Sequence, residues 1–293
     1  MRPVDRGLWA PISRIAIGAA ANSKIPARSY EKMMLRRDFF ASFGHFRSWL
    51  YVAWFQFLIC YRRTLIGPAL LLLGPGLFIA LLGPLFSEVS GISAAIFVPH
   101  LAIGLVVWTL ISGFVTGSTT VFLRNQSKIL QGGMSLTDLV MVDGFTTVLQ
   151  FLHQLVIVVA VFLIFGVGIG LYALVSLSGL MLLVVNGVWL TIVFGIIGAR
   201  YRDLNEVVQA IMRIAFLATP IIWMPGEAGR GGIMGAFLTL NPFYHFLELV
   251  RAPLLGNAIS PLSWLVVLPI TVFGFALAQA MYARFSRIVP LWV

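Results

Sequence analysis

The sequence has little charge, a single cysteine and none of the common nucleotide-binding or hydrolytic motifs. Only 10% of its 293 residues are charged, and Cys60 stands alone, which excludes an intrachain disulfide framework and a thiolate metal site. None of the three lysines follows a glycine, so a P-loop is excluded, and neither H-E-x-x-H nor G-x-S-x-G occurs. We therefore expect no catalytic residues, metal or cofactor in this chain, and any energy source must come from elsewhere.

Apolar residues are abundant instead. They make up 60% of the chain, and the mean hydropathy is +0.98, which is too apolar for a soluble domain of this length. The pattern predicts an all-α, polytopic membrane protein with short re-entrant or periplasmic helices in an external, gate-like segment at 226–261, before the last span. Six transmembrane helices are expected, at about 65–86, 95–115, 145–165, 171–198, 204–224 and 264–282.

The net charge of +10 raises the possibility of nucleic-acid binding, so the placement of the cations decides. No basic helix is interleaved with stacking aromatics. Apart from Arg213, Arg230 and Arg251, every Lys and Arg falls in segments that the six-span topology places on one side. Cations mark the cytoplasmic side, so we expect both termini in the cytoplasm, membrane lipids as neighbours and no nucleic acid.

The N-terminal part is read as two segments. Residues 1–42 are basic and lack the apolar core of a secretory signal, which predicts a cytoplasmic segment. Residues 43–63 are rich in aromatics but interrupted by His45, Arg47 and Gln56. We interpret 43–63 as a helix in the membrane interface, with a first transmembrane span as the alternative.

A charged turn separates the fourth and fifth predicted spans. Arg200 and Arg202 mark a cytoplasmic edge, and Asp203 followed by Glu206 has the spacing of a capping box. The next helix is therefore expected to begin near Leu204.

A polar stripe continues along that helix. Glu206, Gln209 and Arg213 share one face, and Pro220 should kink the helix before Trp223. An intramembrane charge is a functional candidate, so Arg213 could meet anionic groups on a substrate, and snorkelling to the cytoplasmic edge is the alternative.

Several segments after about residue 61 also resemble a known family. They are 61–68 (YRRTLIGP), 104–108 (GLVVW), Asn125 with Ile129, 199–204 (ARYRDL), 219–223 (TPIIW), and Asn241-Pro242 with Arg251. Together they resemble the membrane permeases of type-2 ATP-binding-cassette exporters that move polysaccharides or teichoic acids. The chain departs from the family at 132–134 (GGM), where Phe-Pro is frequent, and at Phe57 and Leu58, where charge is common.

The resemblance implies a homodimeric channel in the bacterial inner membrane, with two copies of a separate cytoplasmic ATPase that binds ATP and Mg²⁺. A polysaccharide or lipid-linked glycan such as capsule or O-antigen would pass between the two permeases, with a periplasmic export partner as a further possibility. The ATPase-coupling residues would be Arg200, Tyr201, Arg202, Asp203, Arg124, Asn125 and Lys128. The substrate channel would include Trp108, Trp189, Arg213, Phe216 and Phe194, and the external gate Asn241, Pro242 and Arg251.

Other interpretations stay open at this point. The arginines of the turn could merely set topology and touch lipid phosphates, and the aromatics could serve helix packing or lipid contact. A membrane acyl- or glycosyltransferase acting on lipid-linked sugars would need acidic residues or histidine clustered at one membrane face. A secondary transporter is disfavoured by the lack of an evident internal repeat and of convincing midplane carboxylates.

Overall fold

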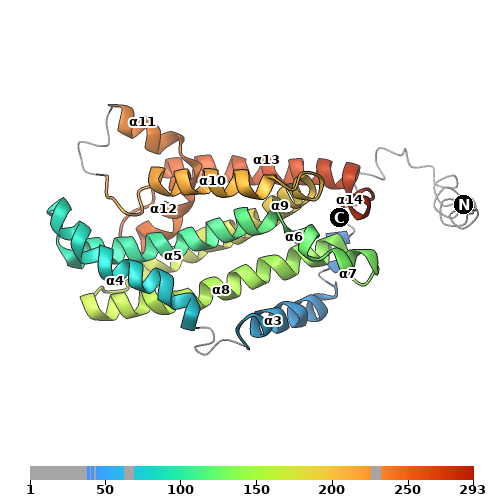
Figure 1. The fold of residues 1–293 in the computed structure, drawn as a ribbon. Helices are drawn as coiled ribbons and strands as arrows, with labels where there is room; N and C mark the ends of the chain where they lie inside the picture. Colours follow the sequence, from blue (N-terminus) through green and yellow to red (C-terminus); the bar gives the residue numbers. More distant parts are fainter. Residues whose placement is uncertain (1–37, 40, 43, 63–68, 226–231) are drawn as a thin grey trace, which may run out of the picture.

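The computed structural model describes residues 38–39, 41–42, 44–62, 69–225 and 232–293, and these residues form helices and connecting turns without a strand (Figure 1). The longer helices are α3 (Phe46–Arg62), α4 (Leu70–Ser90), α5 (Ala94–Ser118), α8 (Leu136–Phe165), α9 (Ser176–Arg200), α10 (Leu204–Ala218), α12 (Pro242–Leu254) and α13 (Pro261–Phe285). The shorter ones are α6 (Val121–Arg124), α7 (Gln126–Leu130), η2 (Leu171–Val175), α11 (Gly232–Leu240) and α14 (Val289–Trp292). The all-α prediction is confirmed for this part of the chain.

Within the residues that the structure describes, five helical segments are long and apolar enough to cross a membrane, which makes this a multi-pass membrane protein. They are Leu70–Ser90, Ala94–Ser118, Leu136–Phe165, Leu171–Arg200 and Pro261–Phe285. Large apolar side chains such as Leu81, Leu163 and Val272 are 70–79% exposed on their outer faces, as lipid contact requires. Five of the six predicted spans correspond to these segments.

The long helices run back and forth between two ends of the bundle (Figure 1). We call them the Arg200 end, where α9 finishes, and the Gly166 end, where α8 finishes. Both described termini lie at the Arg200 end, because Tyr282 Oη near the end of α13 donates a 3.0 Å hydrogen bond to Asp38 Oδ2. Residues 1–37, most of the predicted cytoplasmic N-terminal segment, lie outside the described residues.

The predicted fifth span, 204–224, is not among the five segments, so the six-span count is not confirmed. Its helix α10 begins at Leu204, as expected, but has 15 residues and ends at Ala218. At 1.5 Å per residue it extends about 22 Å, short of a ~30 Å hydrocarbon core. Pro220 thus follows the end of the helix and does not kink it.

The capping box predicted at Asp203 is wrong. Asp203 is the N-cap of α10 but its side chain makes no capping hydrogen bond. A capping box does occur at the start of α8, where Ser135 and Asp138 bond each other's backbone N–H groups. Helix α8 therefore begins at Leu136, before the predicted 145–165 span, and its 30 residues extend about 45 Å, so it projects beyond a membrane of ordinary thickness.

Helix α5 is the centre of the bundle. Of its most apolar stretch 78% is buried, compared with 17% for α4 and 22% for α13, and it packs against α4, α8, α9, α10 and α12. Thr109 on α5 donates a hydrogen bond to the buried Gln154 on α8. This polar contact fixes the register of the two most extensively paired helices.

Helix α3 lies along α8. The Trp49 and Phe145 rings are 6.2 Å apart and the Phe57 and His153 rings 5.0 Å apart, so equal steps along both helices keep them in contact. Helix α3 has 17 residues and is not among the membrane-crossing segments. The structure shows the helix predicted at 43–63 but does not confirm that it lies in the membrane interface.

The predicted gate-like segment contains two short helices, α11 and α12, with 226–231 outside the described residues. Asn241 caps α12 by accepting from the Phe243 N–H at 3.0 Å, and Pro242 follows as the first helical residue, which confirms the predicted cap. Helix α12 is packed inside the Gly166 end, against α5, α9 and α13.

We expect Gly198→Ala to destabilise the fold, because a Cβ at Gly198 would overlap the backbone carbonyl of Thr119, where the end of α9 meets the turn before α6. Overpacking of this kind costs about 1–3 kcal/mol. The check is thermal unfolding of the purified protein in detergent. Gly168→Ala is the matched control, since a Cβ there meets nothing within 4 Å, and equal melting temperatures for the two variants would contradict the packing described.

Candidate functional site

Three of the segments that carry the family resemblance meet at one place. Gly104 on α5 lies against the turn that follows α10, with a Cβ at Gly104 placed 3.3 Å from Ile221 Cγ2. Asn241 Nδ2 donates to Thr219 Oγ1 at 3.1 Å, which ties the start of α12 to the same turn. Helix α5, the 219–223 turn and the start of α12 therefore form one closely packed junction.

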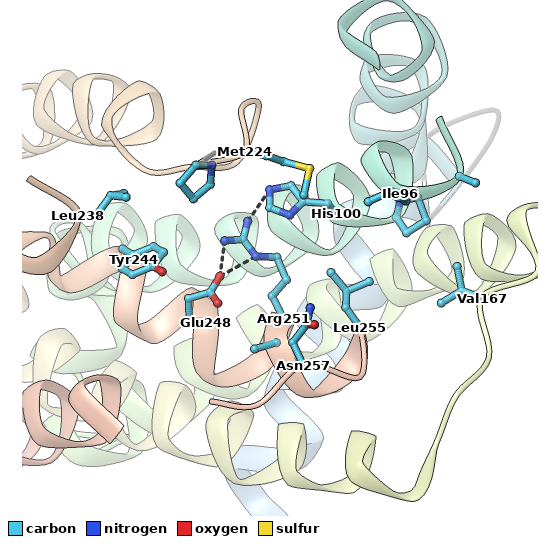
Figure 2. A pocket seen from close by; sticks show the side chains of 14 residues that line it. Ile96, His100, Val167, Met224, Leu238, Tyr244, Glu248, Arg251, Leu255 and Asn257 are labelled. Atoms are coloured by element: carbon cyan, nitrogen blue, oxygen red, sulfur yellow. Dashed lines mark hydrogen bonds and ion pairs between the residues drawn. The ribbon is translucent and has the colours of Figure 1, made fainter. Parts of the chain in front are cut away.

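Arg251 holds this junction together from α12 (Figure 2). Arg251 is 2% exposed. Its Nη1 donates to the Pro220 carbonyl at 2.5 Å and lies 2.9 Å from His100 Nε2. Because arginine has only donors, His100 Nε2 is the acceptor. Both Nε and Nη2 donate to Glu248 Oε1, the former at 2.9 Å. The buried charge is thus paired with a carboxylate, and four of the five guanidinium N–H groups have an acceptor.

A cavity of about 490 Å³ opens beside this cluster at the Gly166 end. Its polar wall is formed by His100, Tyr244, Glu248, Arg251 and Asn257, and its apolar wall includes Ile96, Val167 and Leu255 (Figure 2). Sequence reasoning named Arg251 but missed His100 and Glu248. The available signal was Glu248 three residues before Arg251 within an apolar helical pattern, which places both on one face.

An open groove of about 710 Å³ runs between α5 and α10. Helix α5 contributes Trp108, Ser112 and Thr116, which stand one turn apart on one face, and α10 contributes Gln209, Met212, Arg213, Phe216 and Leu217. Aromatic rings lie at the end of the groove nearest the junction, where Trp108 is 5.7 Å from Phe216 and 5.5 Å from Phe243. Hydroxyl and amide groups line the end toward the Arg200 end.

The structure brings together three of the five predicted channel residues, Trp108, Arg213 and Phe216. Trp189 and Phe194 lie outside the groove lining. Trp189 packs between α9 and α13, where its ring fills the space above Gly274 and its Nε1 donates to Asn186 Oδ1 at 2.7 Å. Phe194 is half-buried against the main apolar core. Sequence reasoning did not single out Ser112 and Thr116.

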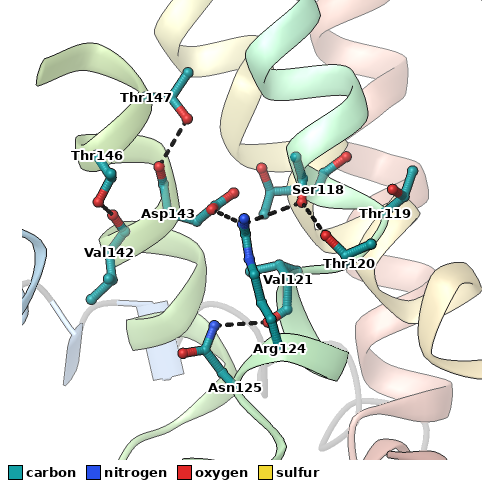
Figure 3. A network of polar contacts seen from close by, with 12 residues as sticks. Ser118, Thr119, Thr120, Val121, Arg124, Asn125, Val142, Asp143, Thr146 and Thr147 are labelled. Atoms are coloured by element: carbon teal, nitrogen blue, oxygen red, sulfur yellow. Dashed lines mark hydrogen bonds and ion pairs between the residues drawn. The ribbon is translucent and has the colours of Figure 1, made fainter. Parts of the chain in front are cut away.

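The predicted coupling residues gather at the Arg200 end, and Figure 3 shows one of their two segments. Arg124 forms an ion pair with Asp143 and donates to the Gly117 carbonyl at 3.3 Å. Lys128 Nζ donates to Asn125 Oδ1 at 2.9 Å, and burial, with a smaller effect from the Arg124 guanidinium, lowers the pKa of the Lys128 ammonium below its ordinary value. Residues 124–128 thus form a small hydrogen-bonded segment at the Arg200 end of the bundle.

The second coupling segment adjoins it. Thr119 Oγ1, before α6, donates to Asn205 Oδ1 at 2.9 Å, which links the two turns. The Arg200 guanidinium lies 5.5 Å from the Trp292 ring centroid of α14. Arg202 and Asp203 are exposed and form no ion pair among the described residues. Their charges are therefore available to a soluble partner or to lipid headgroups.

No protein-family model and no curated protein matches this sequence. Within the described part of the chain, no group of three His, Cys, Asp or Glu side chains could hold a metal ion. What the chain does must therefore be inferred from the groove, the Arg251 cluster and the charged end.

We expect Arg251→Met to be strongly destabilising, because it leaves the Glu248 carboxylate and the Pro220 carbonyl without their buried donor. Removing one partner of a buried pair costs about 3–5 kcal/mol. Thermal unfolding in detergent measures the loss, with Arg284→Met as the control at an exposed site, where about 0.5 kcal/mol or less is expected. A stable Arg251→Met protein would show that the cluster does not hold the junction.

Proposed function

We propose that this chain is the channel-forming permease subunit of an ATP-driven exporter that moves a polysaccharide or lipid-linked glycan across the bacterial inner membrane. The observation that carries the proposal is the convergence of the family-like segments on the aromatic end of an open groove between α5 and α10. In that arrangement Trp108 links Phe216 on α10 to Phe243 on α12.

The chemistry of the groove suits a sliding glycan. Sugar rings present flat C–H faces that stack on aromatic rings, and hydroxyl groups exchange hydrogen bonds with side chains such as Ser112, Thr116 and Gln209. A continuous groove with few fixed polar contacts holds a polymer without trapping one position of it. The groove is open along one side, so it encloses a polymer only when a second surface covers it.

A second copy of the chain is the cover that we propose. The outer face of α10 carries Val207, Ile211 and Ile214, which are 55–69% exposed and repeat at helical spacing beside the groove. Two such faces packed across a two-fold axis would close the two grooves into one path between the permeases. This arrangement agrees with the homodimer that the family resemblance implies.

The distribution of positive charge indicates how the chain is oriented in the membrane. Arg124, Lys128, Arg200, Arg202 and Arg284 are all found in segments at the Arg200 end, so we place that end in the cytoplasm, together with both described termini. In this orientation α10 and the 219–225 segment together make the sixth crossing. Helix α3 then begins at the cytoplasmic interface.

Energy would come from a separate ATP-binding-cassette ATPase that binds ATP and Mg²⁺ and docks on the Arg200 end. The hydrogen bond between Thr119 and Asn205 connects the two candidate docking turns. One of these turns continues directly into α10, which forms a wall of the groove. A push on the turn would therefore move that wall against α5.

The proposal is tested by purifying the tagged chain from its native membrane in a mild detergent and assaying the complex for ATP hydrolysis. We expect an ATP-binding-cassette ATPase to co-purify, and Arg202→Ala or Asp203→Ala to lower complex yield or ATP turnover by about tenfold, since a lost charged contact is worth about 1.5–3 kcal/mol. Arg287→Ala, exposed at the same end, is the matched control. A chain that purifies without an ATPase and ignores both substitutions would contradict the exporter.

A membrane enzyme acting on lipid-linked sugars is the second candidate, because His100 and Glu248 line one cavity at one end of the bundle. Against it, both side chains are engaged by Arg251, which leaves His100 Nε2 occupied as an acceptor. The two functions are separated by assaying the chain alone with a lipid-linked oligosaccharide. Turnover that needs no ATPase and is lost in His100→Gln would favour the enzyme.

A further inference from the structure

Arg213 stands apart from the other described intramembrane arginine. Arg251 is buried and engaged by Glu248, His100 and the Pro220 carbonyl. Arg213 is exposed, forms no ion pair among the described residues, and uses Nε only to donate to the backbone carbonyl of Gln209 at 3.3 Å. Its terminal nitrogens therefore lack a described acceptor.

The position of Arg213 makes this charge costly. It lies roughly 14 Å along α10 from Leu204, and one turn beyond it Phe216 meets Trp108, midway along the central helix. A charge at such depth is expensive in lipid unless it pairs or faces a watery cavity. Arg213 lines the open groove, so its charge is directed at whatever occupies that groove.

The other residues that line the groove indicate which charge a bound molecule would carry. Among the described residues it contains no carboxylate and no second cation; its polar members are Ser112, Thr116 and Gln209, and its aromatic members are Trp108 and Phe216. The groove thus combines one unsatisfied guanidinium, neutral hydrogen-bonding groups and stacking rings. An arginine with free terminal nitrogens binds carboxylate or phosphate oxygens through two parallel hydrogen bonds.

We propose that the groove takes an anionic glycan, one whose repeating unit carries a carboxylate or a phosphodiester, and that Arg213 is the residue that selects it over a neutral glycan. The inference rests on the proposed function, since it names the substrate class of that path. Stacking at Trp108 and Phe216 would hold the ring, while the guanidinium one turn away pairs with the acidic group of the neighbouring unit.

The experiment compares two octasaccharides on the full chain reconstituted in phosphatidylcholine nanodiscs. The probes are a hyaluronan octasaccharide, which carries one carboxylate per disaccharide, and neutral maltooctaose, each titrated by calorimetry up to millimolar concentration. A glycerol-phosphate oligomer distinguishes phosphodiester from carboxylate recognition. The variants are Arg213→Gln, Arg213→Lys and, as a matched control away from the groove, Arg284→Gln.

We expect the anionic octasaccharide to bind about tenfold more tightly than the neutral one at low salt, as a charge-assisted hydrogen bond provides. Arg213→Gln should abolish the difference without weakening maltooctaose, Arg213→Lys should keep part of it, and Arg284→Gln should keep all of it. The preference should also shrink as salt is raised.

Three outcomes would overturn the inference in distinguishable ways. Equal binding of both probes by the unchanged chain, or a preference that survives Arg213→Gln, would contradict anion selection by Arg213 but not the proposed glycan path. Binding of neither probe would contradict both the anion and the path. If phosphatidylglycerol is retained on purification by the unchanged chain but not by Arg213→Gln, and no glycan preference is seen, Arg213 serves a lipid headgroup.

Discussion

The arrangement of the bundle depends on how the backbone at the end of helix α10 finds its hydrogen-bond partners. Helix α10 ends at Ala218 because Pro220 has no N–H to continue it. The interrupted backbone at Thr219 and Pro220 is buried in the bundle, so it must find hydrogen-bond partners within the protein. Arg251 supplies one by donating to the Pro220 carbonyl, and Asn241 Nδ2 supplies another by donating to the Ala218 carbonyl at 3.5 Å. Both donors come from α12. A short helix buried among longer ones is thereby explained as the part that completes the backbone of its neighbour.

This junction also decides where α5 and α10 touch and where they separate. At the Gly166 side of Trp108, Gly104 of α5 contacts Ile221 just after α10, and at the Arg200 end Thr119 donates to Asn205 of α10. The groove lies between these two contacts. Arg213 and Arg251, on α10 and α12, differ in what surrounds them. Arg251 is neutralised by Glu248 and holds the junction together, whereas Arg213 lines the open groove and forms no ion pair with a described residue.

The sequence predicts much of this architecture and little of the site. Hydropathy locates five crossing segments, and the Asn241-Pro242 pair correctly predicts the start of α12. From the sequence, Pro220 is expected to kink a full-length span, because the effect of a proline is judged from its neighbours in the chain. Where the helix ends also depends on hydrogen-bond donors from α12, which lies far along the chain. Trp108 and Trp189 are equally apolar in context, yet only tertiary packing puts Trp189 over Gly274 and Trp108 at the groove. The Arg251 cluster joins His100 to Glu248 across 148 positions, which no local pattern contains.

The central claim, that the groove between α5 and α10 is a water-filled path, is tested most directly by cysteine accessibility. Cys60 is the only native cysteine, so a Cys60→Ser background allows single reporters at Ser112 and Gln209 in the groove and at Ile214 on the outer face. A membrane-impermeant methanethiosulfonate reagent is then applied to vesicles opened on both sides. The account predicts rapid modification at Ser112 and Gln209 and slow modification at Ile214. Reporters in the groove that react as slowly as the one at Ile214 would contradict it.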